Sequence, residues 1–369
     1  MLPMLKHRSI SLFVATLAGL AGLANLGRGQ DAPAARDQPA ATDRLLVGNK
    51  AEHSLSIFDP VTRKELAVLP TGKGPHEIAI SPDGRTAVVS NYGAEEPGRS
   101  LTVVDVLAAK VLRTIELNDE AIEVAERIKT RVFLRPHGCA FVDDTHLVVT
   151  SELTRALIVV DLSKGVVERE LRTPQTTMHM VSLSPDRKRA FATSVRDGNV
   201  ALFTLASAEP PVIIPTGKGS EGLAVNPATG EAWVANRAAN TISIVDPTTQ
   251  KATKELPTGD LPYRVTFAKG GALALIPCAE SGEVYVFDAK EKKLLQAISI
   301  SRDGSEQSPL PMGITVDPDD HFAYVACGRG EFVAVLDLRE SKVIDRIAAR
   351  AGPDGIGYAR ILAATAPRK

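Results

Sequence analysis

The feature that most constrains the fold of this 369-residue chain is a repeated pattern of short apolar segments. Between Gly72 and Asn91, Ile78 and Ile80 alternate with smaller residues, the turn sequence 82–84 (Pro-Asp-Gly) follows, and a second apolar segment ends at Asn91. Alternation at every second residue predicts β-strands, and Pro-Asp-Gly favours a tight turn. Two further apolar segments, 101–105 and 111–115, complete a unit of four strands.

The same unit recurs seven times along the chain. Aligned on the second strand, the copies end at Asn49, Asn91, Ser151, Ser194, Asn236, Cys278 and Cys327. The spacings between these positions are 42, 60, 43, 42, 42 and 49 residues. A period near forty with four strands per unit is typical of a propeller blade. The sequence therefore predicts an all-β, seven-bladed β-propeller with four-stranded antiparallel blades.

The first copy lacks its first strand, because residues 45–49 already correspond to a second strand. The missing segment is at the other end of the chain, where 354–358 aligns with 76–80. We expect this C-terminal strand to pair with the N-terminal strands and to close the propeller over residues 44–360, which removes open sheet edges. Residues 361–369 would then form a tail.

The second strands also indicate a family. Segments 88–91 (Val-Val-Ser-Asn) and 233–236 (Trp-Val-Ala-Asn) resemble the motif for which the YVTN-repeat β-propellers are named. The resemblance covers residues 44–360 and implies the propeller fold, whereas that family hosts many functions. It also implies an architecture similar to the haem-binding domain of haem-d-type nitrite reductases and to bacterial lactonase-like propellers.

The N-terminal residues 1–34 have the pattern of a secretory signal peptide. Lys6 and Arg8 precede an apolar run from Ile10 to Leu26, and residues 32–34 (Ala-Pro-Ala) fit a cleavage site. An uncleaved membrane anchor is the alternative, although about seventeen residues is short for a span. We expect export to the periplasm or the extracellular space, no membrane span after cleavage, and a polar linker over residues 35–43.

Two insertions interrupt the repeat, at 118–132 and 301–308. The first shows no strand alternation; Asn118 could cap a helix, and Ile122, Ala125 and Ile128 would share one helical face. We therefore expect a short amphipathic helix there, either a surface decoration or a functional lid. Both insertions lie between a fourth and a first strand, so one face of the propeller carries them, and that face is the expected binding face.

One position of the repeat concentrates the residues that could carry chemistry. It lies near the start of each first strand, the innermost strand of a blade, and we call its occupants the mouth residues because they should surround the channel mouth. In blade order they are Asp354, His76, His137, His179, Glu221, Tyr263 and Met312. Three histidines fall on consecutive blades, which we call the histidine cluster.

Three interpretations of the histidine cluster are open. His76, His137 and His179 could ligate a transition metal or hold a cofactor, because imidazole suits copper, zinc, iron and nickel, and Cys139 could join them. They could instead bond to loop carbonyls or line a wet channel. A third possibility is a small anionic or polar ligand, for which the candidate residues are His76, His137, His179, Glu221, Tyr263, Arg264, Met312 and Asp354.

Other repeated polar residues have structural explanations. The residues that end the second strands should cap strand ends. Six third strands end in aspartate, and an Asx-turn repeated by duplication explains them without catalysis: Asp59, Asp105, Asp161, Asp246, Asp288 and Asp337. Cys278 and Cys327 occupy equivalent positions one blade apart, which is beyond disulfide reach, so we expect free thiols.

Composition and missing motifs narrow the function. A net charge of −1 offers no basic surface for nucleic acid. The chain has no CxxCH sequence for covalent haem, no GxSxG motif and no P-loop. We expect a monomeric module that binds a small molecule or a protein at the channel mouth. The alternative is a metal- or cofactor-dependent enzyme, either a redox protein or a lactonase-like hydrolase.

Overall fold

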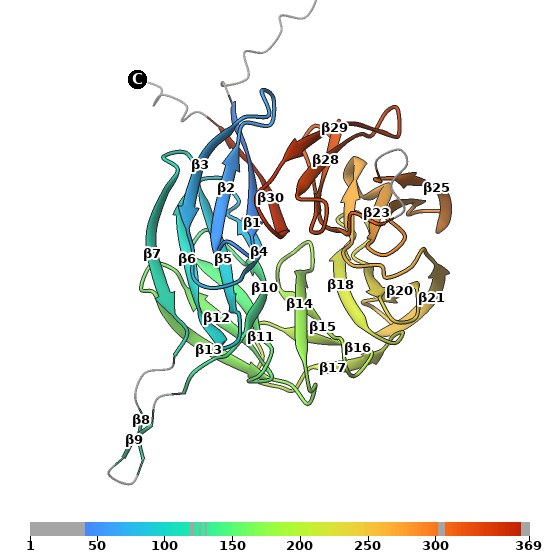
Figure 1. Ribbon diagram of the computed structural model, residues 1–369. Coiled ribbons are helices and arrows are strands. Elements are labelled where there is room, and N and C mark those ends of the chain that lie inside the picture. The colour runs from blue at the N-terminus through green and yellow to red at the C-terminus, as the bar shows by residue number, and fades with distance from the viewer. Residues whose placement is uncertain (1–40, 119–121, 125–126, 130, 302–306, 363–369) are drawn as a thin grey trace, which may run out of the picture. The chain divides into compact units, whose positions relative to one another are not determined.

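The computed structural model describes residues 41–118, 122–124, 127–129, 131–301 and 307–362. These residues form seven four-stranded antiparallel sheets arranged in a ring, which confirms the predicted β-propeller (Figure 1). The predicted signal peptide, residues 1–34, lies outside the described residues. Nowhere in the described ranges is there a helix with the length and apolarity of a membrane span.

The first three blades are as follows. Blade 1 consists of β30 (Pro353–Leu362), β1 (Ala41–Asn49), β2 (Ser54–Phe58) and β3 (Glu65–Pro70). Blade 2 consists of β4 (Pro75–Ile80), β5 (Thr86–Gly93), β6 (Pro97–Asp105) and β7 (Lys110–Glu116). Blade 3 consists of β10 (Pro136–Phe141), β11 (His146–Ser151), β12 (Ala156–Asp161) and β13 (Val166–Arg172).

Four more blades complete the propeller. Blade 4 consists of β14 (Met178–Leu183), β15 (Arg189–Ser194), β16 (Asn199–Thr204) and β17 (Val212–Pro215). Blade 5 consists of β18 (Ser220–Val225), β19 (Ala232–Asn236), β20 (Thr241–Asp246) and β21 (Lys251–Pro257). Blade 6 consists of β22 (Thr266–Ala268), the 3-10 turn η1 (Lys269–Gly271), β23 (Leu273–Cys278), β24 (Glu283–Asp288) and β25 (Lys293–Ser299). Blade 7 consists of β26 (Pro311–Val316), β27 (Phe322–Cys327), β28 (Phe332–Asp337) and β29 (Lys342–Ala348).

The C-terminal strand closes the propeller, as predicted. β30 pairs antiparallel with β1, with Tyr358 opposite Leu45 and Ile356 opposite Val47. The pairing continues to Ala41 and Leu362, so the predicted boundaries of the propeller at residues 44 and 360 were wrong by two or three residues. The linker prediction fails at 41–43 and the tail prediction at 361–362, because these residues extend the ladder.

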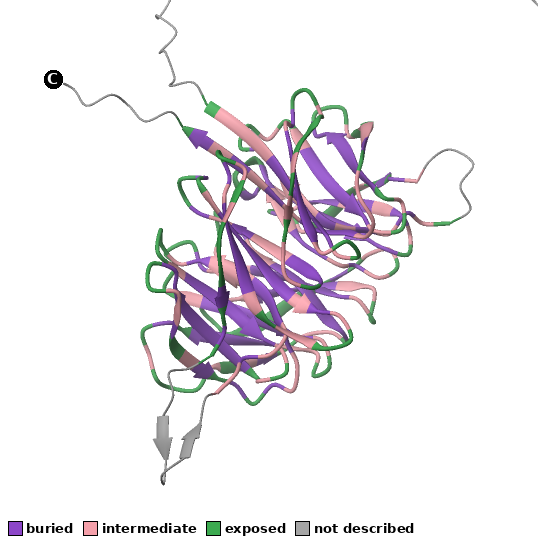
Figure 2. Ribbon diagram, turned by 60° about the vertical axis from the view of Figure 1, so that its left-hand side comes forward, coloured by how far each residue is buried: buried purple, intermediate pink, exposed green. Residues whose placement is uncertain are grey.

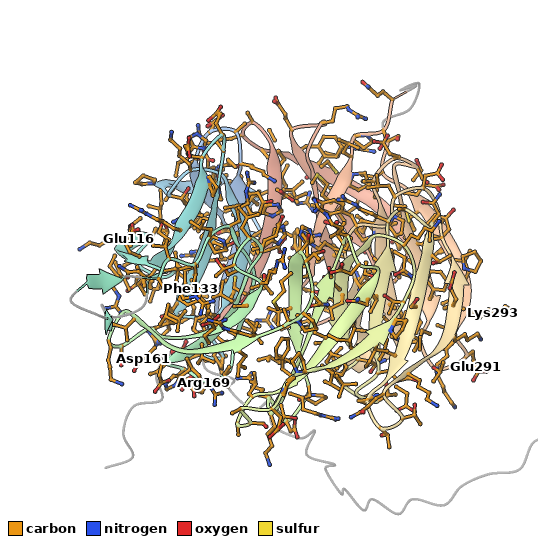
Figure 3. The ribbon with its side chains drawn as sticks, turned by 90° about the horizontal axis from the view of Figure 1, so that it is seen from below. Glu116, Phe133, Asp161, Arg169, Glu291 and Lys293 are labelled. Atoms are coloured by element: carbon orange, nitrogen blue, oxygen red, sulfur yellow. The ribbon has the colours of Figure 1, made fainter. Side chains whose placement is uncertain are left out.

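Most of the hydrophobic core lies between blades. The second strand of a blade is covered on both faces by neighbouring blades, so residues 45–47, 87–89 and 147–149 are fully buried in continuous apolar runs (Figure 2). Outer strands are more exposed, and Figure 3 shows Glu116 of β7 and Lys293 of β25 at opposite edges of the ring. Innermost strands are therefore held rigidly, which suits a site built on them.

The predicted helix in the first insertion was wrong for the residues that the structure describes. β8 (Ile122–Val124) and β9 (Arg127–Lys129) pair antiparallel as a hairpin, and Asn118 forms an isolated bridge with Val132 instead of capping a helix. Each short strand carries β-branched residues, which favour extended backbone.

The structural explanations for the repeated polar residues are confirmed. Asn91 at the end of β5 accepts a hydrogen bond from the Gly72 backbone N–H (3.0 Å) and donates to Ser100 and Thr102, which ties the incoming loop to the blade. Asp59 Oδ1 accepts from the N–H groups of residues 61 and 62, as an Asx-turn cap does. All three cysteines are free thiols.

Candidate metal centre at the channel mouth

A β-bulge positions the mouth residue on the first strand of a blade. In blade 2, Pro75 pairs with Asn91 and Ile78 pairs with Val89, so the β4 side contains one extra residue at His76. A bulge of this kind redirects the side chain that it contains. The residue before the mouth residue pairs with the end of the second strand in the other blades as well: Pro353 with Asn49, Pro136 with Ser151, Met178 with Ser194, Ser220 with Asn236, Pro262 with Cys278, and Pro311 with Cys327.

Threonine hydroxyls fix two of these bulges to the next blade. Thr150 Oγ1 accepts from the Gly138 N–H (2.9 Å) and donates to the His179 carbonyl (2.5 Å). Thr193 makes the equivalent pair of bonds, to the Met180 N–H (3.0 Å) and the Glu221 carbonyl (2.7 Å). Each hydroxyl satisfies a backbone donor that the bulge leaves out of the ladder, and it joins the residue after one mouth residue to the backbone carbonyl of the next mouth residue.

Glycine is required beside His137 because the inner strands approach closely. A Cβ at Gly138 would lie 2.6 Å from the backbone nitrogen of Val181 on the next blade. The small residue therefore allows β10 and β14 to approach each other, and the mouth residues of blades 3 and 4 come into contact.

The three histidine rings lie against one another, with interplanar angles of 44° between His76 and His137 and 39° between His137 and His179. The imidazole centroids of His76 and His137 are 3.9 Å apart, and those of His137 and His179 are 3.7 Å apart. All three residues are buried. Their predicted convergence on one axial space is confirmed. The interpretation that they bond to loop carbonyls is not supported, because no such bond occurs in the described part of the chain.

His137 is the most unusual member of the cluster. It is fully buried, and neither Nδ1 nor Nε2 has a hydrogen-bond partner among the described residues. Burial, together with the charges of His179 and His76, holds its pKa well below the ordinary value, so the imidazole is neutral. An unpaired buried polar atom costs about 1–3 kcal/mol, so this side chain is destabilising unless a ligand binds it.

His179 has one nitrogen occupied and one free. Its Nε2 lies 2.7 Å from Glu221 Oε1, whereas its buried Nδ1 has no hydrogen-bond partner and lies 3.6 Å from Glu152 Oε2. Burial opposes the charged imidazole, but Glu221 and Glu152 outweigh it, and the net result is a raised His179 pKa. Glu152 is itself held by the Tyr92 hydroxyl, which donates to Oε2 at 3.0 Å.

Arg264 crosses the axis from blade 6. Its guanidinium donates to Glu77 of blade 2 and to Glu221 of blade 5 (3.2 Å to Oε1), and it stacks on the Tyr263 ring with its Cζ 4.4 Å from the ring centroid. Burial raises the pKa of Glu77, yet Arg264 and His76 outweigh that effect and bring it to about 2. Burial likewise opposes ionisation of Glu221, but His179 and Arg264 lower its pKa.

The remaining mouth residues border this network. Asp354 is buried and pairs with Lys50 Nζ (3.1 Å), and its Oδ2 lies 3.5 Å from His76 Nδ1. Met312 lies beside Gly328, where an added Cβ would come within 2.9 Å of its sulfur. Neither Met312 nor the Tyr263 hydroxyl makes a polar contact to the histidine cluster among the described residues.

At the channel mouth, two donor sets of the described residues could hold a metal ion, and they share His137. The first is His76, Glu77 and His137, and the second is His137, Glu152 and His179; within each set the ligand atoms lie within 4.8 Å of one another. The second set, which we call the metal triad, fits better. Glu77 is already bound by Arg264, whereas Glu221 holds His179 Nε2, as metal-ligating histidines are usually held. Because the pKa of His179 is raised, Nδ1 would ligate an ion by releasing its proton.

A pocket opens beside the metal triad. It has a volume of about 570 Å³, and Glu152, His179 and Tyr92 form part of its wall. An ion bound by the triad would therefore be accessible from this side and could keep a coordination position open for a further ligand.

Several residues of the site were missed by the sequence analysis. Tyr92, Glu152 and Arg237 immediately follow the aligned positions Asn91, Ser151 and Asn236 of the second strands, and the equivalent residue in blade 1 is Lys50. A comparison of this position across the seven copies would have found all four. Cys139, in contrast, does not join the cluster: the bulge at His137 shifts the alternation of β10, and Cys139 packs against the apolar core between blades 2 and 3.

Comparisons with known proteins identify the fold alone. The sequence matches no known family and no curated protein. A functionally unknown protein from Desulfotomaculum acetoxidans has a similar structure, with a TM-score of 0.68, 15% identity, and coverage of 86% of this chain and 98% of that one. Hydrazine synthase from Kuenenia stuttgartiensis is also similar, with a TM-score of 0.65, 19% identity, and coverage of 84% of this chain and 99% of that one. Because 1638 solved chains match, the likeness does not single out an activity.

Proposed function

We propose that this protein is an exported β-propeller of the YVTN-repeat type that binds a divalent transition-metal ion at its channel mouth. His137, Glu152 and His179 provide the ligands. The observation that carries the proposal is the fully buried, neutral His137 with two unpartnered nitrogens, since a neutral imidazole without a hydrogen bond is ready to ligate.

The residues around the triad support this function. Glu221 binds His179 Nε2 and Tyr92 binds Glu152, so two of the three ligands are held in orientation by a neighbouring polar group. Such supporting groups orient metal ligands and raise affinity. The rigid inner strands provide the fixed geometry that a metal site requires.

The donor set selects the class of ion. Two imidazoles and one carboxylate suit zinc, copper or ferrous iron and are poor ligands for calcium and magnesium, which prefer oxygen. One coordination position of the ion would remain open towards the pocket.

An open coordination position makes a metal-assisted hydrolase or a redox enzyme the alternative function. Assays of metal-loaded protein with lactones and with redox dyes would detect either activity.

The test is metal content and metal affinity. Purified wild-type protein should contain or take up one zinc or copper ion per chain, measured by elemental analysis and calorimetry. His137→Ala and His179→Ala should each weaken binding by more than the roughly 10–100-fold typical of losing a supporting residue. Glu152→Gln, which keeps the shape of the side chain, should weaken binding without disturbing the fold.

Matched variants keep the test specific. His146→Ala removes an imidazole at the start of β11, outside the histidine cluster, and should leave affinity unchanged. His76→Ala should have a smaller effect than His179→Ala if the ion lies in the metal triad. A folded wild-type protein that takes up no ion from zinc, copper or iron solutions would rule out the proposal.

Export is tested separately, by fractionating cells that produce the full chain and locating the protein.

A further inference from the structure

We propose that the pocket beside the metal triad binds a small organic anion, anchored by Arg155 and Arg196. We call this pocket the arginine pocket. The inference deepens the proposed function. It rests on that function only for the contact between the ligand and a metal ion beside His179. The arginine anchor does not depend on a bound metal.

The size and lining of the pocket suit a small organic molecule. Its volume of about 570 Å³ falls within the range of roughly 300–1,000 Å³ that is usual for ligand sites. Tyr92 and Leu153 contribute apolar surface, and Leu153 is 51% exposed. A carbon skeleton of a few atoms could contact these two side chains while its charged group binds elsewhere in the pocket.

The arginines of the pocket differ in their pairing. Arg237 pairs with Glu221 (2.8 Å), so its charge is already compensated. No carboxylate lies within ion-pair distance of the guanidinium of Arg155 or Arg196 anywhere in the described ranges. Both side chains line the pocket from neighbouring blades, 3 and 4. Arg155 lowers the pKa of Asp197 electrostatically, but no hydrogen bond of either guanidinium occurs among the described residues, so their donors are available to a ligand.

The nearby acidic groups are already hydrogen-bonded. Glu152 accepts from Tyr92, and Asp197 accepts from the Thr176 N–H (2.6 Å) and hydroxyl (2.7 Å) and from the Ser194 hydroxyl (2.6 Å). These bonds hold the carboxylates in place. The free donors of the pocket consequently outnumber its free acceptors, which favours an anion over a cation.

A second observation points to a ligand in the same place. His179 is 9% exposed, lines the pocket, and has a buried Nδ1 without a hydrogen-bond partner. A ligand in the pocket is thus adjacent to the open side of the metal triad. Guanidinium groups bind carboxylates and phosphates through two parallel hydrogen bonds, so a carboxylate or phosphate group is the expected anchor.

The experiment titrates two probes, succinate and inorganic phosphate, into metal-free and zinc-loaded protein by calorimetry. We expect wild-type protein to bind at least one probe in both forms, and zinc to strengthen binding. Arg155→Gln with Arg196→Gln should weaken binding by about tenfold or more, because both charge-assisted bonds are lost. The matched control, Arg99→Gln with Arg113→Gln, removes two arginines of blade 2 outside the pocket and should change affinity less than twofold.

The outcomes separate this inference from the proposed function. If wild-type protein binds neither probe, or if the pocket double variant binds as well as wild type, the anion site is overturned. Zinc stoichiometry of the pocket double variant should stay at the wild-type value. Anion binding that persists in a protein unable to take up metal would support the arginine pocket and overturn the metal site.

Discussion

His179 Nε2 lies 2.7 Å from Oε1 of Glu221, and this hydrogen bond joins the inner strands of blades 4 and 5. The bond determines which nitrogen of His179 remains available, since Nε2 is occupied and Nδ1 faces Glu152. Glu221 also compensates two guanidinium groups, those of Arg237 and Arg264. Glu221 is therefore a positioning residue for the metal triad, and its carboxylate balances the positive charges that surround it at the channel mouth.

Glu221→Gln should lower metal affinity by about 10–100-fold, as loss of a supporting group typically does. The amide keeps the volume of the side chain but removes the charge that faces His179 and Arg264. Affinity is measured by calorimetry at a temperature at which thermal melts show the variant to be fully folded. Glu231→Gln, which removes a glutamate that pairs with Lys292 away from the mouth, is the control and should leave affinity unchanged. Equal affinities for Glu221→Gln and wild type would show that Glu221 has no role in holding His179.

His137→Leu should stabilise the metal-free protein while abolishing metal binding. Leucine has a similar volume and removes two buried nitrogens that lack partners, each of which costs about 1–3 kcal/mol. Urea denaturation of metal-free protein should show a higher midpoint for the variant. The higher urea midpoint of the variant relative to wild type should disappear when wild type is saturated with zinc. The ion binds only folded wild type and therefore stabilises it, whereas the variant cannot bind the ion. A lower midpoint for the variant without metal would indicate a structural role for the imidazole.

Thr150→Val should destabilise the protein by about 2–4 kcal/mol. Valine has the same shape but leaves the Gly138 N–H and the His179 carbonyl without their partner in a buried position. Urea denaturation measures the change, with Thr114→Val on the exposed face of β7 as a control expected to stay within about 0.5 kcal/mol of wild type. A near-neutral Thr150→Val would mean that the hydroxyl bond between blades 3 and 4 contributes little.

Asp43→Asn should weaken ring closure in a pH-dependent way. Arg360 of β30 donates to both oxygens of Asp43 on β1 (2.9 and 2.8 Å), and these bonds lower the pKa of Asp43 despite its partial burial. The stabilisation is fully present above the unfolded-state pKa of about 3.9 and is lost as the pH falls through the lower folded-state value. At pH 7 we expect a loss of about 1–3 kcal/mol in the variant.

The stability gap between the two proteins should begin to close as the pH falls below about 3.9 and should vanish only below the lowered folded-state pKa of Asp43, where the carboxyl is protonated in wild type as well. Urea midpoints at pH 7, 5, 4 and 3 measure the gap. Glu116→Gln, which removes an exposed glutamate paired with Arg99, should show no comparable gap at any pH. If the stability difference between Asp43→Asn and wild type stays constant down to pH 3, the Asp43 carboxylate is not the source of the pH-dependent stabilisation.

The repeat made the fold and part of the site predictable. Strand alternation and turn chemistry are local properties, so the seven blades, the register of β30 against β1 and the alignment of the mouth residues could be derived from the sequence. The contact between the rings of His76, His137 and His179 followed from that alignment. The first insertion has no counterpart in other blades, so no repeat was available to test the apolar spacing at 122–128, which favoured a helix where the structure has a hairpin.

Other parts of the site depend on packing that the sequence pattern does not encode. The bulge at His137 leaves no trace in the alternation, so Cys139 was expected on the wrong face. Glu152 reaches His179 of the next blade, and Arg264 reaches Glu77 on the far side of the axis, only because the inner strands converge. Such contacts depend on side-chain length and on the diameter of the ring.

Arg264 also bears on how charged solutes can approach the metal triad. One guanidinium bridges Glu77 and Glu221, so a permanent positive charge lies between the inner parts of blades 2 and 5. The arginine pocket, which Tyr92, Glu152 and His179 help to line, offers a different approach to the metal triad. An ion and an anion that both use this approach would compete for the same space on entry.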